Sequence, residues 1–156
     1  MKSYKKMITV LGYLALLGMF AYIVMKWDST PDQIPAHYNF AGEIDRYDSK
    51  TSILIVPVLT VFLFAMLTAI VHISSMWNMP YEVSENAKEK IQIAIQNMLL
   101  TIRCFITIMF TYMTKCSMNG ESLSAGFTMI MMSGTALCVL ITMFYTFKIN
   151  KKEKNL

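Results

Sequence analysis

The chain has 156 residues, of which 55% are hydrophobic and only 15% are charged, with a mean hydropathy of +0.46 and a net charge of +4 at pH 7. So apolar a composition argues against a soluble globular domain, and so small a positive charge gives no reason to expect nucleic-acid binding. We therefore expect a single integral membrane domain that covers residues 1–156.

Four apolar windows predict four transmembrane helices. A spanning helix needs about 20 mostly apolar residues, and windows of this length lie at residues 8–25, 52–74, 91–113 and 123–147. The first follows the basic start MKSYKK but is longer than the core of a signal peptide, so we expect a retained helix. The expected fold class is an all-α membrane protein, a four-helix bundle with an extracytoplasmic loop cap between the first two helices.

The distribution of lysine and arginine predicts the orientation. Basic residues in short flanking segments are retained on the cytoplasmic side of a membrane. With both termini inside, that side carries nine lysines, whereas the other side carries four basic residues. The nine are Lys2, Lys5, Lys6, Lys88, Lys90, Lys148, Lys151, Lys152 and Lys154, and the four are Lys26, Arg46, Lys50 and Lys115. We expect both termini to be cytoplasmic.

The polar stretch PDQIPAHYNFAGEIDRYDSK, residues 31–50, follows the first window and lies outside in this topology. Pro31 and Pro35 fix their own backbone angles and push the preceding residues toward extended conformations. Asn39 and Gly42 favour turns that branched residues resist. This chemistry predicts an ordered cap over the ends of the helices.

The same stretch resembles the signature of a family of small bacterial membrane proteins, a domain of unknown function that also forms the N-terminal part of Sdp-type immunity proteins. The resemblance covers about the first half of the chain, residues 1–75, and leaves residues 76–156 as an unassigned helical pair. It implies a multi-pass protein of the bacterial cytoplasmic membrane, with an interaction or immunity-type function against a secreted killing peptide. Matching positions that we expect to bind a ligand are Pro31, Asp32, Pro35, His37, Asn39, Gly42, Asp45 and Lys50.

His37 is the only histidine of the loop and lies near several carboxylates. Imidazole can ligate a metal or change its charge near neutral pH, but the spacing between His37 and Asp45 matches no standard metal motif. We expect a hydrogen bond from His37 to the loop backbone or to Asp45, with a metal site on His37 as the weaker alternative. No cofactor is expected.

Arg103 and Asn97 are polar residues inside the third window. An unpaired arginine near the middle of a membrane costs roughly 2.5 to 3.5 kcal/mol, and the four windows contain no Asp or Glu. The partners to be expected for Arg103 are Asn97, hydroxyls such as those of Thr101 and Thr107, backbone carbonyls, lipid headgroups or a bound anion.

Small residues in two windows indicate close helix packing. In the first window they recur every three residues, at Gly12, Ala15 and Gly18, although plain lipid-facing filler explains them equally well. In the fourth window a strip suited to packing within the chain or between copies comprises Gly126, Ser133, Gly134 and Cys138.

The sequence lacks a glycine-rich phosphate loop, paired carboxylates in a protected cleft, and a nucleophile with a base at a recognisable spacing, so we do not expect an enzyme. The leading hypothesis is an interaction or immunity-type membrane protein. Its alternatives are an accessory subunit of a membrane transporter or envelope enzyme and, less favoured, a metal-dependent membrane hydrolase built on His37. The expected partners are the lipid bilayer, a secreted peptide, another membrane protein or a second copy of this chain, and not nucleic acid.

Overall fold

The computed structural model describes residues 2–73 and 83–154. Its elements in chain order are α1 (Lys2–Lys26), β1 (Gln33–Tyr38), β2 (Ile44–Ser49), α2 (Ile55–His72), α3 (Glu85–Asn119) and α4 (Phe127–Lys154), with short 3-10 helices at Trp27–Ser29 and Lys50–Leu54. Each α-helix is long and apolar enough to span a membrane. The four apolar windows therefore correspond to four helices, as the sequence predicts, although Ser74 lies outside the described residues.

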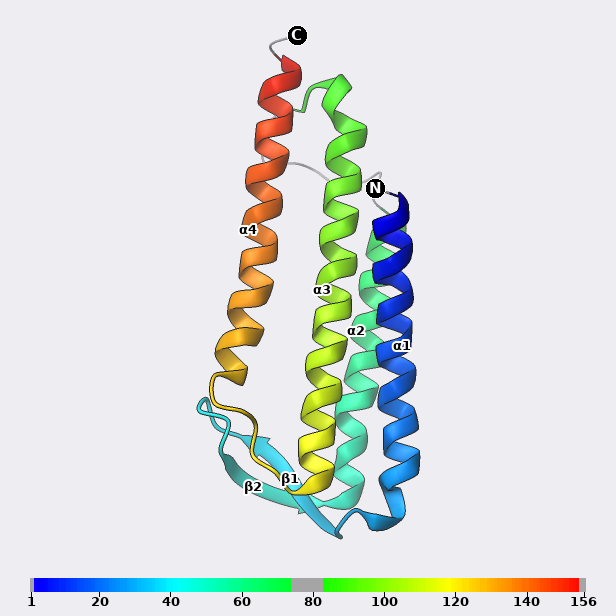
Figure 1. Ribbon diagram of the computed structural model, residues 1–156, viewed down its shortest axis with the longest axis vertical. Helices are drawn as coiled ribbons and strands as arrows, with labels where there is room; N and C mark the ends of the chain where they lie inside the picture. The colour runs from blue at the N-terminus through cyan, green and yellow to red at the C-terminus, as the bar shows by residue number, and fades with distance from the viewer. Residues whose placement is uncertain (1, 74–82, 155–156) are drawn as a thin grey trace.

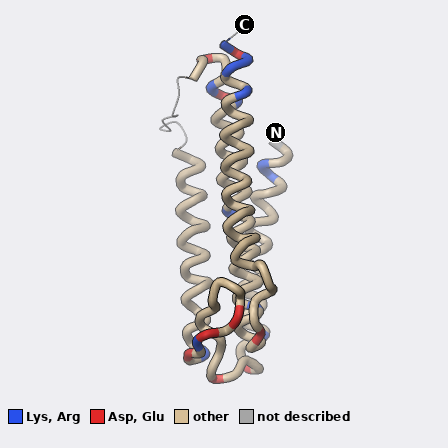
Figure 2. Tube along the Cα trace, turned by 90° about the vertical axis from the view of Figure 1, so that its left-hand side faces the viewer, with Lys and Arg blue, Asp and Glu red and all other residues tan. Residues whose placement is uncertain are grey.

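The helices run alternately up and down, and α3 is the central one because it packs against α1, α2 and α4 (Figure 1). The chain's two ends lie at one end of the bundle, and the strands lie at the opposite end (Figure 1). Acidic residues gather at the end that carries the strands, whereas basic residues gather at the end that carries the termini (Figure 2).

Helix α3 is longer than a membrane requires. Its 35 residues extend over about 52 Å at 1.5 Å per residue, against about 30 Å of hydrocarbon. At its polar start, the Ser84 amide donates to Asn150 Oδ1 over 2.9 Å, and Lys90 Nζ lies 2.6 Å from Glu153 Oε1. These contacts join α3 to the end of α4 where both helices extend past the start of α1 (Figure 1).

Many hydroxyls within the helices are satisfied by their own helix. Thr60, Thr68, Thr107 and Thr111 each donate to the carbonyl four residues earlier, at distances between 2.6 and 2.8 Å. A threonine in an apolar environment needs such a partner, because no water is available to it there. These residues thus lie in candidate spans without exposing a polar group to lipid.

The small residues contribute to helix packing at two positions. A Cβ added to Gly134 of α4 would lie 2.8 Å from Phe105 Cζ of α3, and one added to Gly12 of α1 would lie 3.4 Å from Phe64 Cε2 of α2. By contrast, a Cβ at Gly18 would have no atom within 4 Å, and Gly126 precedes α4 with a φ of +84°. Close packing within the chain is therefore confirmed at Gly12 and Gly134 and is not found at Gly18 or Gly126 among the described residues, while packing between copies stays a prediction.

The expectation of an all-α fold is wrong for the segment between α1 and α2, which forms an antiparallel β-hairpin. Its register pairs Gln33 with Ser49 and Ile34 with Asp48, and it is irregular between Pro35 and His37. Proline has no amide hydrogen to donate to a strand partner, so an irregularity beside Pro35 is the expected outcome. The extended conformations that the two prolines impose are those of a strand.

Candidate functional site

The hairpin rests on the bundle through β1. The side chains of Ile34 and Pro35 are buried, whereas no residue of β2 is. Ile34 belongs to an apolar cluster with residues from α1, the 3-10 helix before α2, and α3, namely Met19, Ile23, Ile53 and Met118. Burying such side chains contributes roughly 1.5 to 3 kcal/mol each. Strand β1 is thus the hairpin's attachment, and β2 is its outer strand.

The turn of the hairpin is closed by Asn39 and Gly42. The Gly42 amide donates to the Asn39 carbonyl over 2.9 Å, and Asn39 also exchanges side-chain hydrogen bonds with Glu43. Gly42 has a φ of +88°, and a Cβ there would lie 3.1 Å from the Leu123 carbonyl oxygen. The Gly42 carbonyl accepts a 2.8 Å hydrogen bond from the Leu123 amide. Gly42 therefore attaches the turn to the connection between α3 and α4.

Two further hydrogen bonds join β1 to the end of α3. The Ser117 hydroxyl donates to the Pro35 carbonyl, and the Tyr38 hydroxyl donates to the Glu121 carbonyl over 3.2 Å. Neither Ser117 nor Glu121 is part of the sequence motif. The motif residues Pro35, Asn39 and Gly42 serve to fold the hairpin and attach it to the bundle, and their expected part in ligand binding stays a prediction.

Burial raises the pKa of the Tyr38 phenol above its ordinary value, and the neighbouring Cys116 raises it further. A phenol in an unfolded chain titrates near 10. Because the folded chain holds this proton more tightly, the unfolded chain releases it first as the pH rises, and stability falls above about pH 10. The contribution of Tyr38 is complete below that pH.

We therefore expect the melting temperature of the wild type in detergent to fall more between about pH 8 and pH 10.5 than that of Tyr38→Phe, which has no phenol to titrate. The measurement is thermal unfolding followed by tryptophan fluorescence at both pH values. Equal falls in the two proteins would show that the environment of Tyr38 does not oppose its ionisation.

Most of the charged and polar motif residues remain at least partly exposed. His37 Nδ1 lies 2.6 Å from Asp45 Oδ1, and these side chains are 60% and 41% exposed. This contact confirms the predicted hydrogen bond between His37 and Asp45. Asp32 and Pro31 are also exposed, and the Asp32 carbonyl accepts from the Lys50 amide over 2.8 Å. Lys50 Nζ lies 4.9 Å from the centroid of the Trp27 ring, in a cation–π contact.

A metal site finds no support in the geometry. Residues 2–73 and 83–154 contain no group of three histidine, cysteine or acidic side chains placed to hold an ion. His37 has Asp45 beside it, and a single carboxylate with an imidazole falls short of the three or four protein ligands of zinc sites. The described residues thus add no further ligand to support a metal site on His37.

A cavity of about 190 Å³ lies between the hairpin, α2 and α3. Its walls combine apolar side chains such as Ile34, Ile55 and Met113 with the charged pair Arg46 and Asp48. In this volume an apolar or basic side chain of a ligand has room beside a carboxylate. The sequence motif contains Arg46 and Asp48, but nothing in it places them at the edge of a cavity.

Arg103 and Asn97 do not form a common site. Arg103 is 2% exposed and donates from Nη1 to Thr68 Oγ1 of α2 over 2.7 Å. Asn97 instead lines a separate cavity with Tyr4 and Cys138. Its Oδ1 is buried without a hydrogen-bond partner in the described part of the chain. A hydroxyl is thus the partner of the guanidinium, as expected, but it belongs to Thr68 rather than to Thr101 or Thr107, whose hydroxyls donate to backbone carbonyls.

Comparison with known proteins finds one similarity. Residues 14–61 match the model of a family described as a domain of unknown function (DUF1648). The match begins within α1, contains the whole hairpin and ends in the first turns of α2. No curated protein and no solved structure matches the chain. The segment that carries the motif is thus similar to a domain of unknown function.

Proposed function

We propose that this chain is an immunity-type binding protein of the bacterial cytoplasmic membrane, with both termini in the cytoplasm and the hairpin on the outer face, where it recognises a secreted peptide. The gathering of basic residues at the terminal end and of acidic residues at the hairpin end supports this orientation (Figure 2), because positive charge is retained inside. The resemblance of the motif to Sdp-type immunity proteins supports the class of function.

One observation carries the proposal: one face of the hairpin is packed against the helix ends, and no other described residue covers the opposite face. Behind it, Ile34, Pro35 and Gly42 are buried against the helix ends. In front, Asp32, His37 and Asp45 are exposed. A surface that is already ordered loses little conformational entropy when it binds a ligand.

The chemistry of this surface favours a peptide with basic and apolar side chains. Acidic residues outnumber basic ones in and beside the hairpin. The acidic residues are Asp32, Glu43, Asp45 and Asp48, and the basic ones are Arg46 and Lys50. The cavity beside Arg46 and Asp48 has apolar walls that can enclose a hydrophobic side chain. Electrostatic attraction of this kind speeds association and selects partners by their charge.

The double variant His37→Ala/Asp45→Asn tests the proposal, because both side chains are exposed and their loss costs the fold at most about 1 kcal/mol. Tagged protein is pulled down from its native membrane in mild detergent, and co-eluting peptides are quantified by mass spectrometry. We expect a secreted peptide to elute with the wild type and about tenfold less with the variant, the effect of losing one charge-assisted contact.

Asp28→Asn is the matched control, since Asp28 is an exposed carboxylate at the same end of the molecule but outside the hairpin. Its peptide yield should equal that of the wild type. A yield that the double variant leaves unchanged would contradict a role for the hairpin in binding. Elution of transporter subunits with no peptide would instead favour the accessory-subunit hypothesis.

A further inference from the structure

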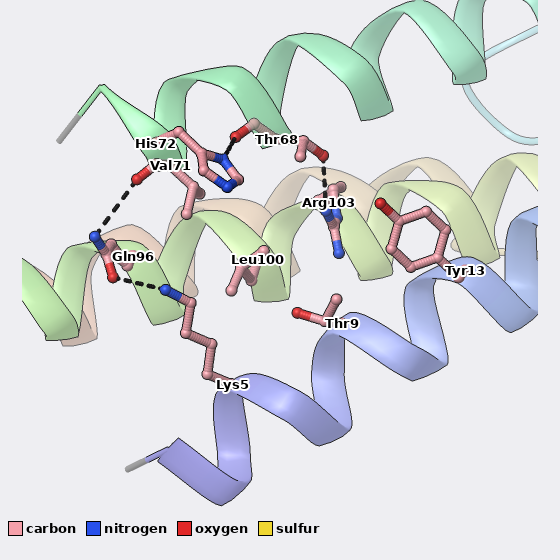
Figure 3. A pocket seen from close by; sticks show the side chains of 9 residues that line it. All are labelled: Lys5, Thr9, Tyr13, Thr68, Val71, His72, Gln96, Leu100 and Arg103. Atoms are coloured by element: carbon pink, nitrogen blue, oxygen red, sulfur yellow. Dashed lines mark hydrogen bonds between the residues drawn. The ribbon is translucent and has the colours of Figure 1, made fainter.

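A second cavity, of about 390 Å³, lies among α1, α2 and α3 at the end of the bundle that carries the termini (Figure 3). Arg103 lies at its inner end, and Lys5, His72 and Gln96 lie toward the ends of the helices (Figure 3). His72 is the last residue of α2, and Lys5 is in the first turns of α1. The cavity therefore leads from the end of the bundle into the candidate spans.

Only part of the Arg103 guanidinium has a hydrogen-bond partner. Nη1 donates to Thr68 Oγ1, and Cζ lies 4.1 Å from the centroid of the Phe64 ring. Nε and Nη2 are buried and have no hydrogen-bond partner among the described residues. These two nitrogens form one edge of the planar group, and their hydrogens point the same way. Two buried donors without acceptors lower the stability of a folded protein.

This edge of Arg103 faces α1. A Cβ added to Gly12 would lie 3.5 Å from Nη2 and 3.7 Å from Nε. Tyr13, next along α1, has its ring centroid 5.5 Å from Cζ. A side chain at position 12 would pack directly against the two nitrogens, and Gly12 keeps that position free of one.

The cavity is positively charged. Lys5 and Arg103 line it, and no aspartate or glutamate among residues 2–73 and 83–154 does. Lys5 Nζ donates to Gln96 Oε1 over 3.0 Å, and Gln96 Nε2 in turn donates to the Val71 carbonyl over 3.4 Å, so the ammonium is positioned at the mouth (Figure 3). Two cations without a counter-charge favour an anionic ligand, and the arginine fork matches two oxygens of one oxyanion.

We propose that this cavity binds a phosphate group, with two phosphate oxygens accepting from Nε and Nη2 of Arg103 and the charge further neutralised by Lys5. The group belongs either to a phospholipid headgroup or to free phosphate. A volume of about 390 Å³ is many times the roughly 30 Å³ of one water molecule, so the site has room for a phosphate with an attached group. The inference is independent of the function proposed for the hairpin.

The test uses the purified full chain in an uncharged detergent and a phosphate-free buffer. The probes are phosphatidylglycerol, a diacylglycerol with the same acyl chains but no phosphate, sodium phosphate, and sodium octanoate as a carboxylate. Melting temperature is measured against probe concentration, and native mass spectrometry counts the bound molecules. The variants are Arg103→Gln and Lys5→Gln, and the control is Lys6→Gln, because Lys6 is the exposed neighbour of Lys5 and does not line the cavity.

We expect phosphatidylglycerol, and not the diacylglycerol, to raise the melting temperature of the wild type and of Lys6→Gln. Half-saturation should require about tenfold or more probe in Arg103→Gln, and several-fold more in Lys5→Gln, as the loss of charged hydrogen bonds predicts. A response to sodium phosphate with the same dependence on Arg103 identifies free phosphate as the source, and a response to the lipid alone identifies the headgroup. Either result supports the proposal.

Equal responses to phosphatidylglycerol and diacylglycerol would overturn it, because they would show binding by acyl chains alone. So would an equal half-saturation in Arg103→Gln and the wild type, or an octanoate response as strong as that to phosphate. If Arg103→Gln does not fold, the test rests on Lys5→Gln. Half-saturation of Lys5→Gln and Lys6→Gln at the same phosphatidylglycerol concentration would then rule the site out.

Discussion

Substituting Gly42 with alanine is expected to lower the free energy of unfolding by about 2 to 4 kcal/mol. A side chain at the φ of +88° found here is strained in the left-handed region. The new Cβ would also lie 3.1 Å from the Leu123 carbonyl oxygen and 3.2 Å from Leu123 Cβ, tighter than most such contacts in proteins. Relief of this contact requires the turn to move away from Leu123 and weakens the hydrogen bond between them.

Substitutions at two other glycines distinguish the cost of the backbone conformation from the cost of the close contact with Leu123. Gly120 has a φ of +71° but no atom within 4 Å of an added Cβ, so Gly120→Ala should show the backbone cost alone, about 1 to 2 kcal/mol. Gly18 lies inside α1 with neither problem, and Gly18→Ala should be neutral or stabilising by up to about 1 kcal/mol. Reversible denaturant unfolding in mixed micelles gives the three values. Equal losses for Gly42→Ala and Gly120→Ala would show that the contact with Leu123 is unimportant.

Replacing Arg103 with methionine is expected to raise the free energy of unfolding by about 1 to 3 kcal/mol in the absence of a ligand. The guanidinium is 2% exposed and makes one hydrogen bond, while two of its nitrogens have no partner in the described chain. Methionine fills a similar volume without a charge to desolvate. Thr68 keeps a partner, because its hydroxyl donates to the Phe64 carbonyl.

Thr68→Val should instead lower the free energy of unfolding by about 1 to 3 kcal/mol. It removes the hydroxyl that accepts the hydrogen bond from Nη1 and leaves the buried guanidinium without that partner. In the Arg103→Met background the same substitution should cost little, so a double-mutant cycle isolates the pair. Arg46→Met, at an exposed position, should change the value by less than about 0.5 kcal/mol. A destabilised Arg103→Met would mean that the ring faces of Phe64 and Tyr13 stabilise the cation more than burial penalises it.

If Arg103 lowers the free energy of unfolding, then a functional requirement explains the presence of an arginine at this position better than a role in folding does. Proteins keep costly polar groups inside a membrane where these groups bind or move a ligand. The same residue then carries both a stability cost and the proposed phosphate site. Addition of phosphatidylglycerol should narrow the stability difference between the wild type and Arg103→Met, since binding stabilises only the folded chain with the arginine.

The four helices could be predicted because long apolar windows are a strong, local signal. Their ends were less predictable: α3 begins at Glu85, before the window that starts at Ile91, because its polar first turns remain helical where they contact Asn150 and Glu153 of α4. The hairpin could not be identified from alternation, since every side chain of β2 is at least partly exposed and the strand therefore lacks a buried apolar face.

Within the candidate sites, local contacts were predictable and distant ones were not. His37 and Asp45 lie eight residues apart in one loop, and their hydrogen bond follows from that proximity. Thr68 lies 35 residues from Arg103 and is one of many threonines in the spans, so no local pattern selects it. Ser117, near the end of α3, and Leu123, in the connection that follows, attach the hairpin, and no local sequence pattern marks either of them.

The position of α3 at the centre of the bundle has a consequence for synthesis. Pro35 and its partner Ser117 are 82 residues apart in the chain, which corresponds to roughly 4 to 16 s of translation at 5 to 20 residues per second. During that interval α1, the hairpin and α2 exist without the helix against which all three pack. The newborn hairpin can already pack Ile34 against Met19 and Ile23 of α1, but it lacks the hydrogen bond from Ser117 until α3 has been made.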